Sequence, residues 1–254
     1  MSTVKPNARK LALAGLAGTM AVSACLMQSA EAQSSAPKLS RAEQACMSRL
    51  NKDFDKITRS TKESVKPEDR EIALAAACTV KVTKSLQIKA ARDFIKTNFG
   101  QDPGQPVNFI PGASPSSPSL ILFGDKSLAS STLPKTSQKT GRSFYVVTGS
   151  TPAHLDIYAG GNSVPSYVGL GPRMSQTLAK LGKKGSFRVV GISGNPVAPT
   201  LLLKDSSGRQ FGFSYSNSKI IPASKLQELN YPQPSRITEL EARLNWAVLD
   251  DQTK

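Results

Sequence analysis

The sequence has very few of the residues on which most enzymes rely: its 254 residues include one histidine, one tryptophan and three cysteines. Any histidine-dependent nucleophile must use His154. Neither Cys46 nor Cys78 has a CxxC spacing and His154 is far from both, so we expect no metal site and no cofactor. A G-x-S-x-G motif is also missing. These absences argue against a standard enzyme.

The sequence has one long hydrophobic run, at residues 11–27, and no other run approaches the roughly 18 residues needed to span a bilayer. Basic residues at 5–10 precede it, and Ala30-Glu31-Ala32 places small residues where a signal peptidase cleaves. This pattern is typical of a bacterial secretory signal peptide at 1–32. We expect export to the periplasm or cell surface of a bacterium, with an uncleaved anchor as the alternative.

The three cysteines have different expected fates. Val22-Ser23-Ala24-Cys25 resembles a lipobox, so Cys25 is either removed with the signal peptide or lipidated, and only lipidation would give membrane contact. Cys46 and Cys78 remain as an even pair in an oxidising compartment, which favours one disulfide bond. Two buried free thiols are the alternative.

Acidic residues are scarce: 18 Asp and Glu stand against 33 Lys and Arg. Such a field favours anionic polymers and lipid headgroups, although general solubility explains it equally well. Four cations cluster at an expected helix end and the start of an expected strand: Lys180, Lys183, Lys184 and Arg188. They are candidates for anion binding, with solvated structural residues as the alternative. We expect no specific nucleic-acid partner.

Helical signals fill the first third of the chain after residue 38. Ser40 and Glu43 have the spacing of a capping box, and an apolar stripe that includes Cys46 follows. A second helix is expected from Pro67 to a Gly100 cap, with Cys78 on its apolar side. A short connection makes the two helices antiparallel, so the Cys46–Cys78 bond would join a helical hairpin at 33–101.

Residues 102–118 are rich in Pro, Gly and Ser, and residues 124–142 are polar and basic. We therefore predict a flexible linker at 102–142 with one short strand at 120–123. Strand-like patterns begin at residue 143, and Asp205-Ser206-Ser207-Gly208 has the composition of a hairpin turn. The strands are expected at 143–149, 154–159, 166–170, 186–192, 199–204, 209–215 and 218–221. Within one of them, Phe211, Phe213 and Tyr215 form either core or a stacking platform.

A helix is expected at 173–181, ended by Gly182, and an amphipathic helix at 236–250 completes the chain. The expected fold is α+β: the disulfide-linked hairpin, then a small, mostly antiparallel β barrel or sandwich with a C-terminal helix at 143–254.

These patterns favour an exported, non-catalytic cell-envelope protein that binds or scaffolds other components. Its partner would be an envelope protein, an anionic polymer or a lipid headgroup. The alternative is an exported hydrolase of wall or polymer substrate that uses His154 with Asp156, two residues further along one expected strand.

Overall fold

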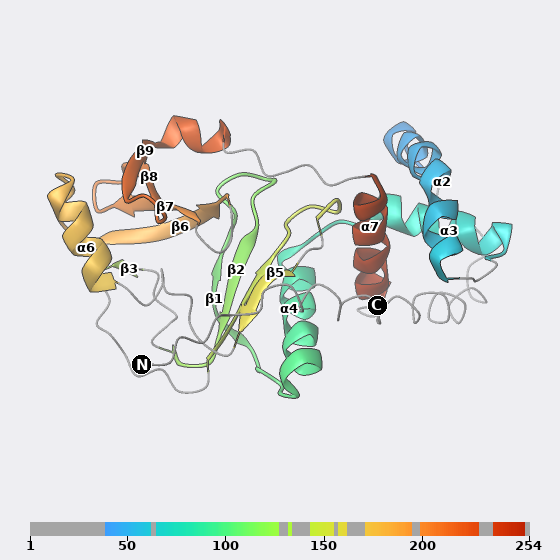
Figure 1. The fold of residues 1–254 in the computed structure, drawn as a ribbon, viewed down its shortest axis with the longest axis horizontal. Helices are drawn as coiled ribbons and strands as arrows, with labels where there is room; N and C mark the ends of the chain where they lie inside the picture. The colour runs from blue at the N-terminus through green and yellow to red at the C-terminus, as the bar shows by residue number, and fades with distance from the viewer. Residues whose placement is uncertain are drawn as a thin grey trace. The chain divides into compact units, whose positions relative to one another are not determined.

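The structure, a computed structural model, describes residues 39–61, 65–126, 132–133, 143–154, 157–161, 171–194, 199–228 and 236–251. The expected signal peptide, Cys25 and the expected strand at 166–170 lie outside these residues. The described residues form five α-helices and two antiparallel sheets, so the α+β class is confirmed (Figure 1).

The chain divides into two compact units. One, here called the helical unit, contains the described residues up to Val80 and from Arg236 onwards. The other, the sheet unit, contains the described residues between Lys81 and Pro234. The helical unit is therefore built from both ends of the described chain, and the sheet unit lies between them in sequence.

The helical unit contains α2 (Arg41–Thr61), α3 (Pro67–Thr79) and α7 (Arg236–Asp251). The capping box at the start of α2 is confirmed: the Ser40 amide donates to Glu43 Oε2 at 2.6 Å, and the Glu43 amide donates to Ser40 Oγ at 3.3 Å. One buried cluster joins the three helices, and its members are Leu50, Phe54, Ala73, Leu74 and Leu240.

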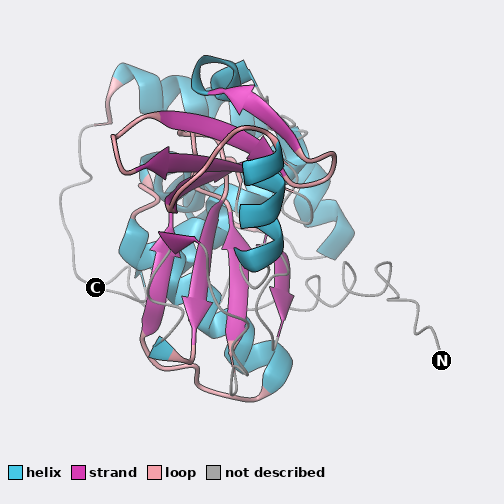
Figure 2. Ribbon diagram, turned by 90° about the vertical axis from the view of Figure 1, so that its left-hand side faces the viewer, coloured by secondary structure: helices cyan, strands magenta, loops and turns pink. Residues whose placement is uncertain are grey.

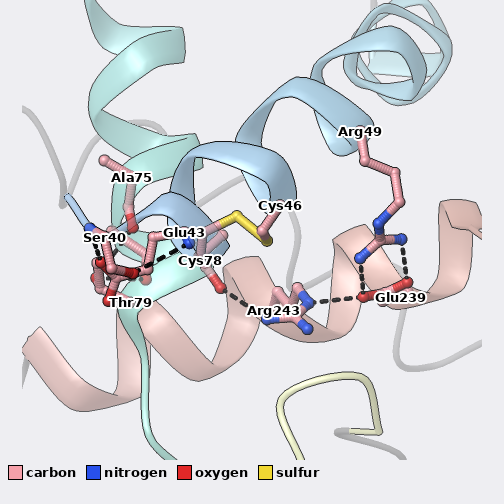
Figure 3. The surroundings of a disulfide bond; sticks show 11 residues. Ser40, Glu43, Cys46, Arg49, Ala75, Cys78, Thr79, Glu239 and Arg243 are labelled. Atoms are coloured by element: carbon pink, nitrogen blue, oxygen red, sulfur yellow. Dashed lines mark hydrogen bonds and ion pairs between the residues drawn. A yellow bond between two sulfur atoms is a disulfide. The ribbon is translucent and has the colours of Figure 1, made fainter.

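The disulfide bond is confirmed. Cys46 in α2 and Cys78 in α3 are bonded with their Cα atoms 5.9 Å apart, inside the usual range for a disulfide (Figure 3). Both cysteines pack against the apolar cluster of the helical unit. The covalent link therefore joins two helices at the edge of the same core.

The single helix expected from Pro67 to Gly100 is two helices, which is a correction. α3 ends at Thr79, and α4 (Lys84–Phe99) begins after Thr83, whose side chain accepts a hydrogen bond from the Leu86 amide at 3.2 Å. The break falls in a segment rich in β-branched residues, which lower helix propensity, and threonine is a favoured N-cap. Gly100 does end α4, with φ of 64°.

The sheet unit contains two sheets. The first has the order β1-β2-β4-β5, from β1 (Pro106–Ile110), β2 (Ser119–Phe123), β4 (Phe144–Thr148) and β5 (Ile157–Gly161). The second has the order β3-β6-β7-β8-β9, from β3 (Thr132–Leu133), β6 (Phe187–Ser193), β7 (Thr200–Asp205), β8 (Gln210–Ser214) and β9 (Lys219–Pro222). The helices α4 and α6 (Gly171–Lys180) and the 3-10 helix η4 (Ala223–Glu228) complete the unit.

The layers of the sheet unit follow from strand alternation. Leu120 and Leu122 of β2 join the core that the two sheets share with α6, whereas Ile121 and Phe123 join the core beneath α4. All five residues of β2 are buried, which explains its unbroken apolar run. The two sheets appear as separate groups of strands in Figure 2.

The barrel alternative is not confirmed, because the two sheets do not close. Among the described residues a single bridge, Gly112–Ile192, joins them, and there the Ala113 amide donates to the Ile192 carbonyl at 2.7 Å. The shared core fits the sandwich alternative. Phe211 and Phe213 lie in this core, so the stacking-platform alternative for that row is not supported.

Two expectations about the middle and end of the chain also differ from the structure. The expected linker at 102–142 contains strand β1, which begins at a proline, a residue tolerated at the first position of a strand. The C-terminal helix, expected with the sheets, packs with α2 and α3 instead. An amphipathic stripe indicates that a helix buries one face, but it does not indicate in which core.

Candidate functional site

Positive charge is concentrated in the sheet unit. Residues 81–234 carry 18 Lys and Arg against 6 Asp and Glu, a formal charge of +12. The segments 39–80 and 235–254 carry 11 of each sign and have no net charge. No Asp or Glu occurs between residues 157 and 204. The excess positive charge of residues 39–254 thus lies in the segment 81–234, and half of it, +6, lies at residues 157–204, which include α6 and β6.

Three of the four predicted anion-binding cations lie at the C-terminal end of α6. Gly182, with φ of 76°, ends the helix: its amide donates to the Ala179 carbonyl at 3.0 Å, and the Lys183 amide donates to the Leu178 carbonyl at 2.8 Å. These two bonds form a Schellman motif, which requires a left-handed residue and favours glycine. The motif fixes the backbone from which Lys180, Lys183 and Lys184 project.

Lys183 differs from its neighbours because it packs against the core. Its Nζ lies 5.0 Å from the centroid of the Phe211 ring, and Phe211 is itself 5.5 Å, edge to face, from Phe187. A cation over an aromatic face gains roughly 0.5–1 kcal/mol at a partly exposed site. Lys183 is therefore a half-buried anchor, whereas Lys180 and Lys184 are exposed.

Arg188, the fourth predicted residue, belongs to a different face. It lies on β6 between Phe187 and Val189, which both contact the shared core, so alternation directs Arg188 to the opposite side. There it is the cross-strand partner of Lys204 on β7. Like charges in this position repel each other. The structure therefore places Arg188 on a different face from the three lysines. It also places Lys204 beside Arg188, a neighbour that the sequence did not predict.

The nearest acid along the chain does not neutralise this pair of cations. Asp205 accepts from the Ser207 hydroxyl at 2.6 Å and from the amides of Ser207 and Arg209, each at 2.9 Å. The Ser207 hydroxyl and then Arg209 lower the pKa of Asp205 to about 2, so the carboxylate is ionised and committed to the β7–β8 turn. None of Lys180, Lys183, Lys184, Arg188 or Lys204 forms an ion pair with a described carboxylate.

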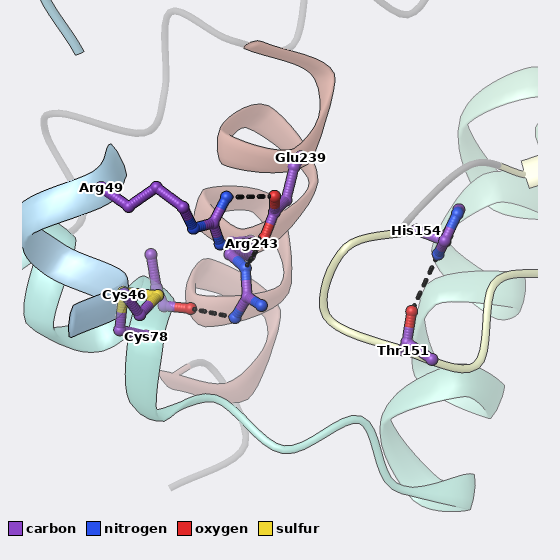
Figure 4. Close-up of polar contacts among 8 residues, drawn as sticks. Cys46, Arg49, Cys78, Thr151, His154, Glu239 and Arg243 are labelled. Atoms are coloured by element: carbon purple, nitrogen blue, oxygen red, sulfur yellow. Dashed lines mark hydrogen bonds and ion pairs between the residues drawn. A yellow bond between two sulfur atoms is a disulfide. The ribbon is translucent and has the colours of Figure 1, made fainter. Parts of the chain in front are cut away.

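His154, the residue on which the hydrolase alternative depends, lies in a turn after β4. It is 4% exposed, and its Nδ1 is 2.9 Å from the Thr151 hydroxyl (Figure 4). The Ser150 hydroxyl instead donates to the carbonyl oxygens of Pro115 and Ser117, at 2.8 and 2.6 Å. Asp156 lies outside the described residues. His154 is thus a buried residue at the end of a half-buried turn, in contact with Thr151.

A network of ion pairs links the helices of the helical unit. Glu239 of α7 accepts two hydrogen bonds from the Arg49 guanidinium of α2, at 2.6 and 2.7 Å, and one from Arg243 at 2.8 Å. Arg243 in turn donates to the Ala77 carbonyl of α3 at 3.4 Å. The network therefore connects all three helices of this unit.

This network predicts an acid-sensitive helical unit. The hydrogen bonds from Arg49, followed by those from Arg243, lower the pKa of Glu239 to about 2 from its usual 4.5. A carboxylate with a lowered pKa stabilises the fold above its unfolded pKa, and that contribution disappears as the pH falls from about 4.5 through about 2. Because Arg49 is partly exposed and solvent screens its charge, we expect the ionised Glu239 to contribute about 1–2 kcal/mol to the free energy of unfolding.

The variant Glu239→Gln measures this contribution. At pH 7 its free energy of unfolding should be about 1–2 kcal/mol lower than that of the wild type, and the difference should shrink as the pH falls towards 2. Urea unfolding followed by the fluorescence of Trp246, which is buried in α7, gives both values. An unchanged difference between pH 7 and pH 3 would contradict the role assigned to the charge.

The helical unit also has a groove of about 430 Å³ between α2 and α3, lined in part by Met47, Pro67 and Leu74. Its arginine, Arg70, already donates to Asn51 Oδ1 and to Asp55 Oδ1, each at 2.6 Å. In the described part of the chain, no group of three or more His, Cys, Asp or Glu side chains is placed to hold a metal ion. No helix there has the length and hydrophobicity to cross a bilayer.

Comparison with known proteins adds no assignment: no protein-family model, no curated protein and no solved structure matches this chain.

Proposed function

We propose that this protein is an exported, non-catalytic component of the bacterial cell envelope that binds an anionic partner through the sheet unit. The disulfide bond is consistent with export, because such bonds persist in oxidising compartments. The observation that carries the proposal is the charge asymmetry: +12 on residues 81–234 and zero on the segments of the helical unit. A field of this kind attracts polyanions and raises their rate of association.

The binding surface is centred on the exposed lysines at the end of α6. Lys180 and Lys184 project from a fixed Schellman turn and have no described carboxylate as partner. Lys183 adds a third charge whose position is held by Phe211. Arg188 and Lys204 form a second pair of cations on the opposite face of their sheet. An extended anion such as a polymer or a headgroup layer suits this spread of charge better than a small molecule does.

Retention on a heparin column tests the proposal. The wild type should be retained and should elute at raised salt, because screening weakens interactions between exposed charges. The double variant Lys180→Glu/Lys184→Glu should lose affinity on the order of tenfold at low salt. Elution of the variant at the wild-type salt concentration would contradict the proposed surface.

A matched control separates a local site from overall charge. Lys52 and Lys66 are exposed residues of the helical unit, so Lys52→Glu/Lys66→Glu changes the charge of the chain by the same amount in the neutral unit. We expect this variant to elute close to the wild type. Equal losses in the two double variants would show that only net charge matters.

A further inference from the structure

Leu181 is a large apolar side chain that the structure leaves in solvent within the lysine cluster. It is 42% exposed, and among the described residues the only other large hydrophobic side chain that is exposed is Ile72, at 47%. Ile72 lies on α3 of the neutral helical unit, whereas Leu181 follows Lys180 and is separated from Lys183 by one glycine. Exposure beside cations, and not exposure alone, distinguishes Leu181.

The position of Leu181 is fixed by its backbone. Its amide contacts the carbonyl oxygens of both Thr177 and Leu178 at 3.1 Å, at the last turn of α6. Leu178 is fully buried in the shared core and holds this end of the helix to the sheets. Leu181 therefore projects from a rigid support, so that ordering it on a partner surface costs little conformational entropy.

From this juxtaposition we infer that the tip of α6, residues 180–184, docks on an anionic lipid bilayer, with Leu181 inserted between the headgroups and Lys180 and Lys184 bound to their phosphates. The inference rests on the proposed function and identifies the anionic partner of the protein as a lipid bilayer. A soluble polymer would satisfy the lysines and leave Leu181 in water. A bilayer satisfies the lysines and also removes apolar surface from water, which is the combination seen in interfacial membrane binding.

The absence of acid in this part of the sequence strengthens the fit. Residues 157–204 contain six cations and no Asp or Glu, so no carboxylate of this segment approaches the membrane with its tip. A negatively charged leaflet attracts each nearby Lys or Arg, and each contributes about fivefold in affinity. Two exposed lysines and one leucine give weak, reversible docking that depends on salt and lipid charge.

Co-sedimentation with phosphatidylglycerol vesicles tests the inference, with phosphatidylcholine vesicles as the neutral comparison. The wild type should sediment with the first and not with the second. Leu181→Ser should lower the affinity for phosphatidylglycerol vesicles about tenfold, since it removes most of the inserted apolar area. It should leave retention on heparin unchanged. Ile72→Ser, the matched control in the helical unit, should change neither measurement.

The charge variant should behave differently from the leucine variant. Lys180→Glu/Lys184→Glu should lose at least about thirtyfold in affinity for the vesicles and should also bind heparin more weakly. Docking through this tip is supported if the lysine variant binds both heparin and vesicles more weakly, whereas Leu181→Ser binds only the vesicles more weakly. Far-ultraviolet circular dichroism should show that each variant remains folded.

The results that overturn the inference are distinct from those that overturn the proposed function. If the wild type binds heparin but not phosphatidylglycerol vesicles, or if Leu181→Ser binds the vesicles like the wild type, insertion is wrong and the anionic partner is a polymer or an acidic protein. If the wild type binds neither heparin nor vesicles, the proposed function fails as well.

Discussion

Removing the Cys46–Cys78 bond should lower the free energy of unfolding of the helical unit by about 3–4 kcal/mol. The bond joins residues 32 positions apart, and in the chain-entropy model a loop of that length restricts the unfolded chain by this amount. The buried apolar cluster that would have to compensate is small, with five buried members. Small units with limited cores depend on such links.

The chain offers separate spectroscopic reporters for this experiment. Trp246, the single tryptophan, is buried in α7 of the helical unit, and all five tyrosines of the sequence lie at residues 145–231, within the segment 81–234. In urea, the Trp246 transition of Cys46→Ala/Cys78→Ala should move to lower concentration. The tyrosine signal of the sheet unit should keep its own midpoint.

Two comparisons make the result specific. The wild type treated with a reductant should behave like the double variant, because both lack the covalent link. Addition of reductant to the double variant should change nothing further. Coincident Trp246 transitions for the oxidised wild type and the variant would show that the core and the Arg49–Glu239–Arg243 network hold the three helices without the disulfide.

Local signals in the sequence predicted the elements of the fold that depend on neighbouring residues. The capping box of Ser40 and Glu43, the Gly182 cap and the β7–β8 hairpin each need only a few adjacent residues, and all three are confirmed. The disulfide was predicted from an even count of cysteines on two apolar faces. Each of these predictions rests on chemistry that does not depend on how the sheets and helices pack against one another.

Packing between distant segments could not be predicted in the same way. α3 and α4 each bury one face, so the apolar periodicity continues through residues 80–83. The sequence therefore did not reveal that the two faces belong to different cores. Residues 102–118 contain five prolines, which concealed β1 at the edge of its sheet. Nothing in the stripe of α7 distinguishes a partner helix from a partner sheet.

The candidate site was predicted in part, for the same reason. The clustering of Lys180, Lys183 and Lys184 is visible in the sequence because they are near neighbours on one turn. The separation of Arg188 depends on strand alternation, and its pairing with Lys204 depends on a register that the sequence does not reveal. Leu181 reads as an ordinary apolar residue of the helix, and only its exposed fraction singles it out.

The second large effect is expected at Gly149, in the turn that carries His154. A Cβ atom added to Gly149 would overlap the His154 carbonyl oxygen and lie 2.5 Å from its carbon, because the turn folds back on itself through the Thr151–His154 bridge. The colliding atoms are backbone, so a side-chain rotation cannot relieve the clash. Gly149→Ala must therefore open the turn.

Opening this turn would also break a buried link between α4 and the first sheet. The Gln87 side chain, 4% exposed, donates to the Gly149 carbonyl at 2.8 Å and contacts the Ser119 hydroxyl at 3.3 Å. A buried amide left without its acceptor costs about 1–3 kcal/mol. With the displaced backbone added, we expect Gly149→Ala to lower the free energy of unfolding of the sheet unit by at least about 3 kcal/mol.

Gly104→Ala is the matched control for this effect. Gly104 has open space where its Cβ would lie, but its φ of 70° is unfavourable for alanine, so the substitution should cost only about 1 kcal/mol. Urea unfolding followed by the tyrosine signal gives the free energy of unfolding of each variant. The difference between the two values isolates the clash from the general effect of replacing glycine. Equal losses would mean that the turn adapts, and that the contact of His154 with Thr151 does not require close approach of the backbone at Gly149.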